Sequence, residues 1–148
     1  MKKLCIITNT IASLFTITCG GVHLFLPYVF PWEAQLEPTC DYMTWAMFAD
    51  NFFFSVLLIW AGILSLMAFS TLKLNKTGIL WIIGGMSLFW LFGCGYELII
   101  PFPFPIVKWV LPIFAFSTAF LYGVALYSFL WVERNKQNRQ SQTGKSIN

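Results

Sequence analysis

The sequence predicts an all-α integral membrane protein, a four-helix bundle built from two similar helical hairpins with both termini in the cytoplasm. Three observations support this prediction. The chain is 58% hydrophobic and only 10% charged, whereas soluble domains carry roughly 25% charged residues. Its apolar residues fall into four blocks, and nearly all of its basic residues lie outside these blocks. The blocks are about 4–26, 52–71, 78–100 and 107–132.

Each block is long enough to cross a membrane. A helix rises ~1.5 Å per residue, so about 20 residues span the ~30 Å hydrocarbon core of a bilayer. A soluble fold with a mean hydropathy of +0.73 would expose large apolar patches, which monomers rarely tolerate. We therefore predict one transmembrane domain over residues 1–132, followed by a disordered cytoplasmic tail over 133–148 that has no apolar periodicity.

The placement of lysine and arginine predicts how the spans are oriented. Cytoplasmic segments of membrane proteins collect these residues, and the connection 27–51 contains none of them. We therefore expect both termini and the central connection inside the cell, in the plasma membrane (the bacterial inner membrane). The net charge of +3 follows from this topology and predicts no nucleic-acid partner. Apart from Lys108, the basic residues are Lys2, Lys3, Lys73, Lys76, Arg134, Lys136, Arg139 and Lys145.

The first span runs outward from Lys3. It is predicted to end near Pro27 and Pro31, because proline removes a backbone donor and stops a helix. Since the apolar run continues to Phe30, we expect a retained span and no cleaved signal peptide. The connection that follows is the longest in the chain, and its aromatic residues suit the membrane interface. Helix is expected to begin within it, over 44–54, ahead of the second span.

A repeated motif relates the two halves of the domain. The segments Gly21–Pro31 and Gly95–Pro105 share the frame Gly-x-(His/Glu)-Leu-apolar-apolar-Pro-aromatic-x-Phe-Pro. Each copy ends a long apolar block and holds one ionisable residue at the same place, His23 or Glu97. Each unit contains two spans, so the repeat predicts a pseudo-twofold axis along the membrane normal, with the histidine facing the glutamate.

The connections divide the domain into two repeat units, 1–74 and 75–132. The six-residue turn 72–77 makes the second and third spans an antiparallel pair. The proline-rich connection 101–105 is too stiff and too poor in donors to form a helix, and it leads directly into the fourth span.

Small and weakly polar side chains recur on one face of each of the first two spans. Such a face permits close backbone approach and interhelical hydrogen bonds, which drive helix association in lipid. We expect both faces to lie in the bundle interior, with the larger apolar residues against lipid. The residues are Asn9, Ser13, Thr16, Gly20, His23 and Pro27 in the first span and Asn51, Ser55, Leu58, Gly62 and Ser65 in the second.

Four polar residues are predicted to gather near the outer edge of the hydrocarbon core. His23 and Glu97 each lie about 30 Å of helix from the basic residues that begin their spans, and Asp50 and Asn51 begin the second span from the same side. An ionisable residue within a span is costly and is usually paired or placed in a water-filled cavity. We predict an outward-facing polar pocket, formed by His23 and Glu97 and helped by Asp50 and Asn51, that binds a ligand or a proton. The alternatives are a purely structural His–Glu pair, unpaired solvent-facing side chains, and a sparse metal site of His23, Glu97 and Asp50.

We predict no catalytic residues, and we treat a metal site only as an alternative to the ligand or proton site. The cysteines Cys5, Cys19, Cys40 and Cys94 have neither a C-x-x-C motif nor metal-ligand spacing. We interpret them as small apolar residues, with a Cys19–Cys94 contact and an outer disulfide of Cys40 as alternatives. The sequence contains no glycine-rich phosphate-binding loop and no Ser/His/Asp set of the kind that activates a catalytic nucleophile. We therefore expect no enzyme activity from this chain alone, and its residues do not identify a cofactor.

Three classes of function fit these predictions. The preferred one is a membrane protein whose outer pocket binds a small amphipathic or quinone-like ligand, as an accessory subunit of a membrane redox complex. The second is an oligomeric small transporter with a proton-linked His23/Glu97 pair. The third is an assembly or scaffolding subunit of a larger membrane complex. The expected partners are the lipid bilayer and either another membrane protein or further copies of this chain.

The layout of the four spans resembles that of the DoxX-like group of small four-helix membrane proteins. The resemblance extends over spans one to four and implies four membrane helices. Because some members of this group are associated with quinone-linked oxidoreductase complexes, it also implies a redox partner. It rests on the layout of the spans and on no residue motif, so it assigns no functional residue.

Overall fold

Four long helices make up the described part of the chain. The computed structural model describes residues 1–29, 41–69, 74–100 and 107–145, and every regular element within these ranges is a helix. The helices are α1 (Lys2–Val29), α3 (Asp41–Met67), α4 (Lys76–Ile99) and α5 (Val107–Lys145). All four are long and apolar enough to cross a membrane. The predicted all-helical class and the predicted number of candidate spans are therefore confirmed.

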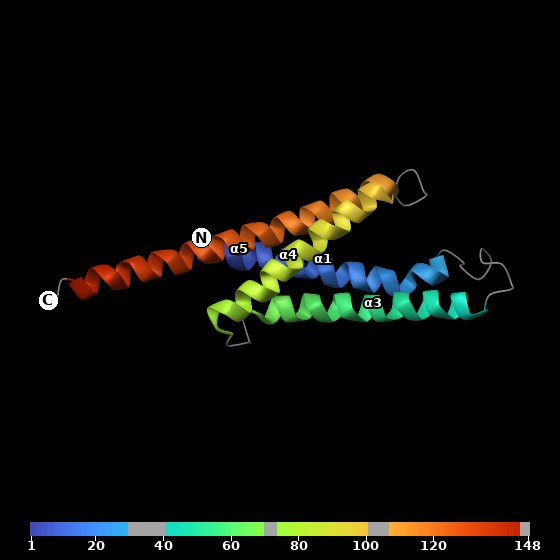
Figure 1. Cartoon of the computed structure of the whole chain (residues 1–148), viewed down its shortest axis with the longest axis horizontal. Coiled ribbons are helices and arrows are strands. Elements are labelled where there is room, and N and C mark those ends of the chain that lie inside the picture. Colours follow the sequence, from blue (N-terminus) through green and yellow to red (C-terminus); the bar gives the residue numbers. More distant parts are fainter. Residues whose placement is uncertain (30–40, 70–73, 101–106, 146–148) are drawn as a thin grey trace.

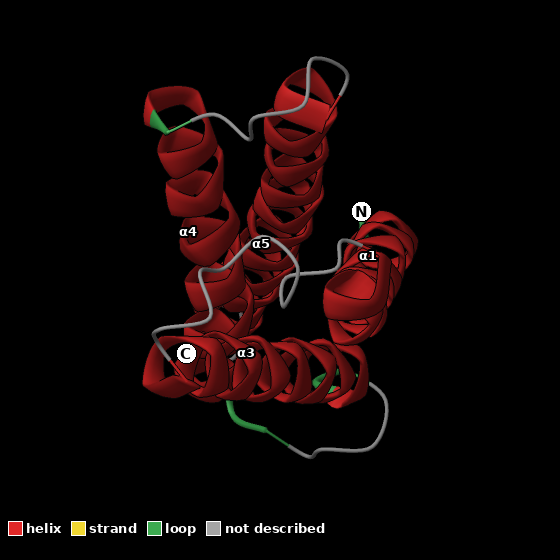
Figure 2. Cartoon of the chain, turned by 90° about the vertical axis from the view of Figure 1, so that its right-hand side faces the viewer, coloured by secondary structure: helices red, strands yellow, loops and turns green. Residues whose placement is uncertain are grey.

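The helices pack as two antiparallel hairpins. Contacts are most extensive between α1 and α3 and between α4 and α5, and the α1–α5 interface joins the two hairpins. Helices α3 and α4 make few contacts, although a short turn connects them. Figure 1 shows why: α4 starts beside the end of α3 and then crosses away from it. At the end of the bundle away from the chain termini, the α4–α5 hairpin diverges from the α1–α3 hairpin (Figure 2).

This packing departs from the twofold symmetry that the repeated motif predicts. A twofold axis relating the hairpins would map the α1–α5 interface onto the α4–α3 interface. The first of these interfaces is extensive and the second is small. The resulting asymmetry opens space between the hairpins, and the candidate site lies in that space.

One helix end agrees with the sequence prediction and another differs from it. Helix α1 is described to Val29, between Pro27 and Pro31, near which the first span is predicted to end; Pro27 fits in the last turn because it removes only one backbone hydrogen bond there. Helix α5 continues to Lys145, through residues that we predict as a disordered tail. This segment is rich in good helix formers, and Lys136 donates to Glu133 one turn away. Residues 32–40, for which we predict an interfacial location and which include Cys40, and residues 101–105 lie outside the described part of the chain.

The small polar faces of the first two spans meet in the bundle interior, as predicted. Ser13, Thr16, Ser55 and Ser65 have no exposed surface. At Gly20 the backbone of α3 approaches so closely that a Cβ atom would lie 2.8 Å from the Ser55 carbonyl oxygen. The α1–α3 interface therefore depends on glycine as well as on polar contacts.

Buried hydrogen bonds join the helices along this interface. The Asn9 side-chain amide donates to the Ser65 carbonyl oxygen (2.9 Å), and Ser65 Oγ donates to Asn9 Oδ1 (3.1 Å). Further along α1, Trp90 Nε1 donates to Thr16 Oγ1 (3.0 Å), and the Tyr122 hydroxyl lies 3.2 Å from the same atom. Thr16 therefore connects α1 to both α4 and α5. For helices that cross a membrane such bonds would matter, because lipid contributes no hydrophobic drive to helix association.

Two buried serines should respond in opposite ways to replacement by alanine. Ser65→Ala leaves Asn9 Oδ1 without its donor, so we expect a loss of about 1 kcal/mol in the free energy of unfolding. Ser128 is equally buried, but its hydroxyl has no hydrogen-bond partner in the described structure. Ser128→Ala removes an unsatisfied group and should be neutral or stabilising. Reversible unfolding in mixed micelles, followed by circular dichroism, measures both effects, and equal destabilisation by the two variants would contradict the bonding described here.

Candidate functional site

A pocket of about 510 Å³ lies where the two hairpins diverge. All four helices contribute to it, so it exists only in the assembled bundle. We call it the inter-hairpin pocket. It is lined by Cys19, His23, Phe54, Leu58, Phe89, Trp90, Phe92, Gly93, Tyr96, Glu97, Leu111, Phe114 and Ala115.

His23 and Glu97 both line the inter-hairpin pocket, from α1 and α4 respectively. Both side chains are partly buried. The His23 ring packs edge-on against Phe54 of α3, with ring centroids 5.1 Å apart and an interplanar angle of 74°. In the described part of the chain no hydrogen bond or ion pair joins His23 to Glu97. The two groups thus share a pocket and leave the space between them open.

Asn51 supports the site without lining this pocket. Its side-chain amide donates to the His23 carbonyl oxygen at 2.7 Å, and this bond holds the end of α1 against α3. The Asn51 side chain lies in a neighbouring pocket of about 430 Å³, which Leu24 and Pro27 also line. Its contribution is therefore to position the backbone that carries the imidazole.

Asp50 does not belong to the inter-hairpin pocket, contrary to the sequence prediction. It is exposed and lies outside the residues that line the pocket. Adjacent residues on a helix are about 100° apart around its axis. Since Asn51 faces α1, Asp50 must point away from it. Depth along the helices groups the four residues, but depth does not report rotation, and both Asp50 and Asn51 of α3 lie outside the lining of this pocket.

Six of the thirteen residues that line the inter-hairpin pocket are Phe, Trp or Tyr. Phe54 and Phe89 lie with ring centroids 6.3 Å apart, and Trp90 packs edge-on against Phe114 at 5.5 Å and 77°. The sequence predicts that large apolar residues such as these lie against lipid. Because these residues lie on three different helices, no regular spacing in the sequence marks them as one group. Only the crossing of α4 over the bundle brings them together.

Trp90 connects the pocket wall to the bundle core. One side of its ring lines the pocket, and its indole N–H donates to Thr16. Trp90 is 6% exposed, so its N–H depends on this internal acceptor. The wall is therefore held in a defined position, as a binding site requires.

The thiols and ionisable side chains near the inter-hairpin pocket limit the kinds of ligand that it could bind. Cys19 lines the pocket as a free thiol, and Cys5 and Cys94 are free as well, so no disulfide joins Cys19 to Cys94 in the described structure. Within the described residues, no three His, Cys, Asp or Glu side chains lie close enough together to hold a metal ion. The pocket combines an apolar aromatic wall with one imidazole and one carboxyl group, which suits hydrogen bonding to a polar headgroup.

Comparison with protein-family models, with curated proteins and with solved structures finds no match to this chain.

Proposed function

We propose that this protein spans the membrane with both termini in the cytoplasm and binds a small amphipathic, quinone-like ligand in the inter-hairpin pocket. One observation carries the proposal: an aromatic-walled pocket between the hairpins holds both His23 and Glu97. The ring of the ligand packs among the aromatic side chains, and its polar substituents meet the imidazole and the carboxyl group.

The size and composition of the pocket support a ligand of this class. Pockets for small molecules commonly measure roughly 300–1,000 Å³ and combine apolar walls with a few polar groups, and this one is about 510 Å³. A quinone offers a flat ring and carbonyl acceptors. An imidazole N–H donates to such an acceptor, and so does a carboxylic acid in its protonated form. Stacked and edge-on aromatic contacts add to the burial of the ring.

The separation of α3 from α4 supports entry from the bilayer. These helices make few contacts, and Phe89 and Phe92 line the pocket from α4 and are exposed at its surface. An apolar tail can leave the pocket between these helices and remain in lipid while the headgroup is bound. A water-soluble substrate without an apolar tail would gain no binding energy from an opening toward lipid.

Binding without catalysis fits an accessory role. We assign the binding of the quinone-like headgroup to this pocket and electron transfer to a partner subunit. This reading agrees with the role that the DoxX-like layout implies. The transporter and scaffolding functions stay predictions, and the experiment below separates them from ligand binding.

Gly93 offers a direct way to fill the pocket. It lines the pocket from α4, and no atom lies within 4 Å of the position a Cβ would take. Gly93→Leu should therefore fold normally and place its side chain in the ligand space. We expect affinity to fall by about tenfold or more, since displacing the leucine or the ligand costs at least about 1.4 kcal/mol. The measurement is tryptophan quenching by decylubiquinone and by a short-chain menaquinone, with the full chain in lipid nanodiscs.

Gly95→Leu is the matched control. It makes the same substitution at the same depth of α4, where a Cβ also meets no atom within 4 Å, but it lies outside the pocket lining. It should leave quinone binding unchanged. Equal affinities for Gly93→Leu and the parent, or unchanged binding by the double variant His23→Ala/Glu97→Ala, would rule out the proposed site. A purified protein that binds no quinone but transports a solute into liposomes would favour the transporter.

A further inference from the structure

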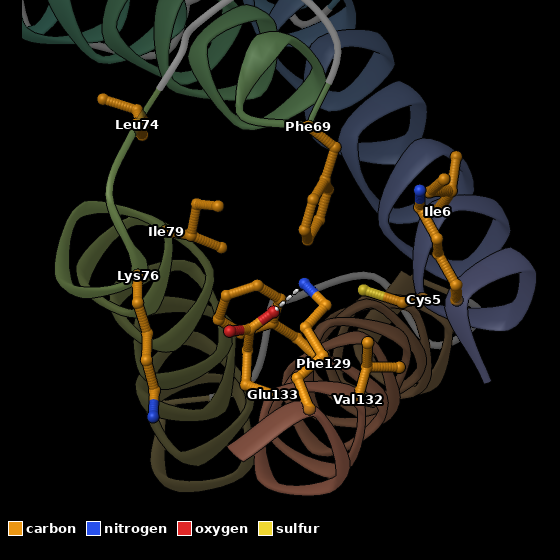
Figure 3. A pocket seen from close by; sticks show the side chains of 11 residues that line it. Cys5, Ile6, Phe69, Leu74, Lys76, Ile79, Phe129, Val132 and Glu133 are labelled. Atoms are coloured by element: carbon orange, nitrogen blue, oxygen red, sulfur yellow. Dashed lines mark hydrogen bonds and ion pairs between the residues drawn. The ribbon is translucent and has the colours of Figure 1, made fainter. Parts of the chain in front are cut away.

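A second pocket, at the end of the bundle that carries both chain termini, combines lysines with an apolar floor. It measures about 340 Å³ and is bordered by the start of α1, the end of α3, the start of α4 and residues 129–136 of α5. Figure 3 shows Phe69, Ile79 and Phe129 in the interior, Glu133 close to them with its ion pair dashed, and Lys76 at the rim with its ammonium end directed outward. We call it the basic pocket. We propose that it binds the headgroup of an anionic phospholipid and the first part of one acyl chain.

The charges around the basic pocket are mostly positive. Lys2, Lys76 and Lys136 line it, against one carboxylate, Glu133. Lys136 is paired with Glu133. In the described part of the chain no carboxylate pairs with Lys2 or Lys76, which come from different helices. Helices α1 and α4 also begin here, so the positive ends of their dipoles add to the field of the ammonium groups. A phosphodiester would meet uncompensated positive charge from two sides.

The floor of the basic pocket is apolar. Ile79 and Phe129 are each 9% exposed, and Cys5 is 3% exposed. Phe69 packs against Phe129 with ring centroids 5.8 Å apart. A free phosphate would use only the rim of such a site, whereas a phospholipid would use both rim and floor. Basic pockets between membrane helices are known to take lipid headgroups, and the ends of the candidate spans are where headgroups lie. The chemistry of the whole pocket therefore favours the lipid.

This inference is independent of the proposed quinone site, which lies toward the other end of the bundle. It also does not depend on which side of the membrane the termini occupy, because the pocket faces whichever leaflet surrounds that end. Its failure would leave the inter-hairpin pocket unaffected.

The test compares lipids and variants with the full chain in a neutral detergent. Native mass spectrometry measures binding of phosphatidylglycerol, of phosphatidylcholine with the same acyl chains, and of inorganic phosphate. We expect phosphatidylglycerol to bind preferentially. Lys2→Gln and Lys76→Gln should each weaken it by about fivefold, the value of one lysine near an anionic headgroup. The double variant Lys108→Gln/Arg134→Gln has the same net charge as the double variant Lys2→Gln/Lys76→Gln but leaves the lining of the basic pocket intact, so it should keep the parent's affinity.

Glu133→Gln gives a prediction of opposite sign. It removes the only carboxylate lining the pocket and releases Lys136, so phosphatidylglycerol should bind more tightly than to the parent. Asp50→Asn makes the same change in net charge at an exposed position outside both pockets, and it should have no effect.

Several results would overturn the proposal. Equal binding of phosphatidylcholine would reduce the site to an apolar groove, and equal binding of inorganic phosphate would make it a site for soluble anions. An equal loss in the Lys108→Gln/Arg134→Gln variant would show general attraction by net charge. Thermal unfolding in phosphatidylcholine checks that each variant folds. If the lysine variants unfold, the Glu133→Gln arm still decides the question, because unchanged or weaker binding there contradicts the proposal.

Discussion

Gly20→Ala is expected to destabilise the protein by about 1–3 kcal/mol, the range for overpacking a tight interface. The new Cβ would lie 2.8 Å from the Ser55 carbonyl oxygen and 3.0 Å from the Ile59 backbone nitrogen. Backbone atoms of a neighbouring helix cannot move aside as a side chain can, so α1 and α3 would have to separate. The same geometry recurs at Gly62, where a Cβ would lie 3.0 Å from the Ser13 carbonyl oxygen.

The adjacent residue supplies the control. A Cβ at Gly21 meets no atom within 4 Å, and alanine is a better helix former than glycine by about 1 kcal/mol. Gly21→Ala should therefore be neutral or stabilising. Unfolding titrations in mixed micelles, with helix content followed by circular dichroism, measure both variants. If the two substitutions change the free energy of unfolding equally, the close α1–α3 crossing at Gly20 is wrong.

Thr16→Val is expected to have the second large effect, because it removes the acceptor that three helices share. Thr16 donates its single hydroxyl hydrogen to the Ala12 carbonyl oxygen at 2.9 Å, Oγ1 accepts from Trp90 Nε1, and the Tyr122 hydroxyl lies 3.2 Å from the same oxygen. Valine has nearly the same shape but no acceptor. The buried Trp90 N–H is then unsatisfied, which costs about 1–3 kcal/mol. The junction between the two hairpins should weaken most.

Thr118→Val is the matched control for this variant. Thr118 is as fully buried as Thr16, but its hydroxyl donates only to the Phe114 carbonyl oxygen in its own helix. Replacing it should cost little, since a local bond of this kind adds little to helix stability.

A double-mutant cycle isolates the contribution of the indole N–H. Trp90→Phe removes the donor that Thr16→Val leaves unsatisfied. The double variant should therefore be less destabilised than the sum of the two single variants, by about 1 kcal/mol. Additive effects would mean that the Trp90–Thr16 hydrogen bond contributes nothing to stability. Because Trp90 also lines the inter-hairpin pocket, Thr16→Val should weaken quinone binding in parallel.

The inter-hairpin pocket illustrates how much depth along a helix predicts from sequence. His23 and Glu97 occupy matching places in a repeated motif, and both line one pocket. The rise per residue of a helix predicts that they lie at similar depth, because both residues lie near the ends of spans of similar length. Asp50 was assigned to the same group on depth and is exposed instead. Depth does not report rotation, which depends on the packing of α3 against α1.

Hydropathy and residue spacing alone determined the candidate spans and the interior faces of α1 and α3. They do so because a bilayer demands about 20 apolar residues per crossing and because close helix packing in lipid requires small side chains. The length of α5 did not follow from these rules, because the bilayer places no demand on a segment beyond the span. Only the tertiary structure decided that α3 and α4 separate, that Trp90 bonds to Thr16, and that three lysines converge at the opposite end. Each of these three features depends on the angle at which whole helices cross. Many small contacts together set that angle, and no local sequence pattern reports it.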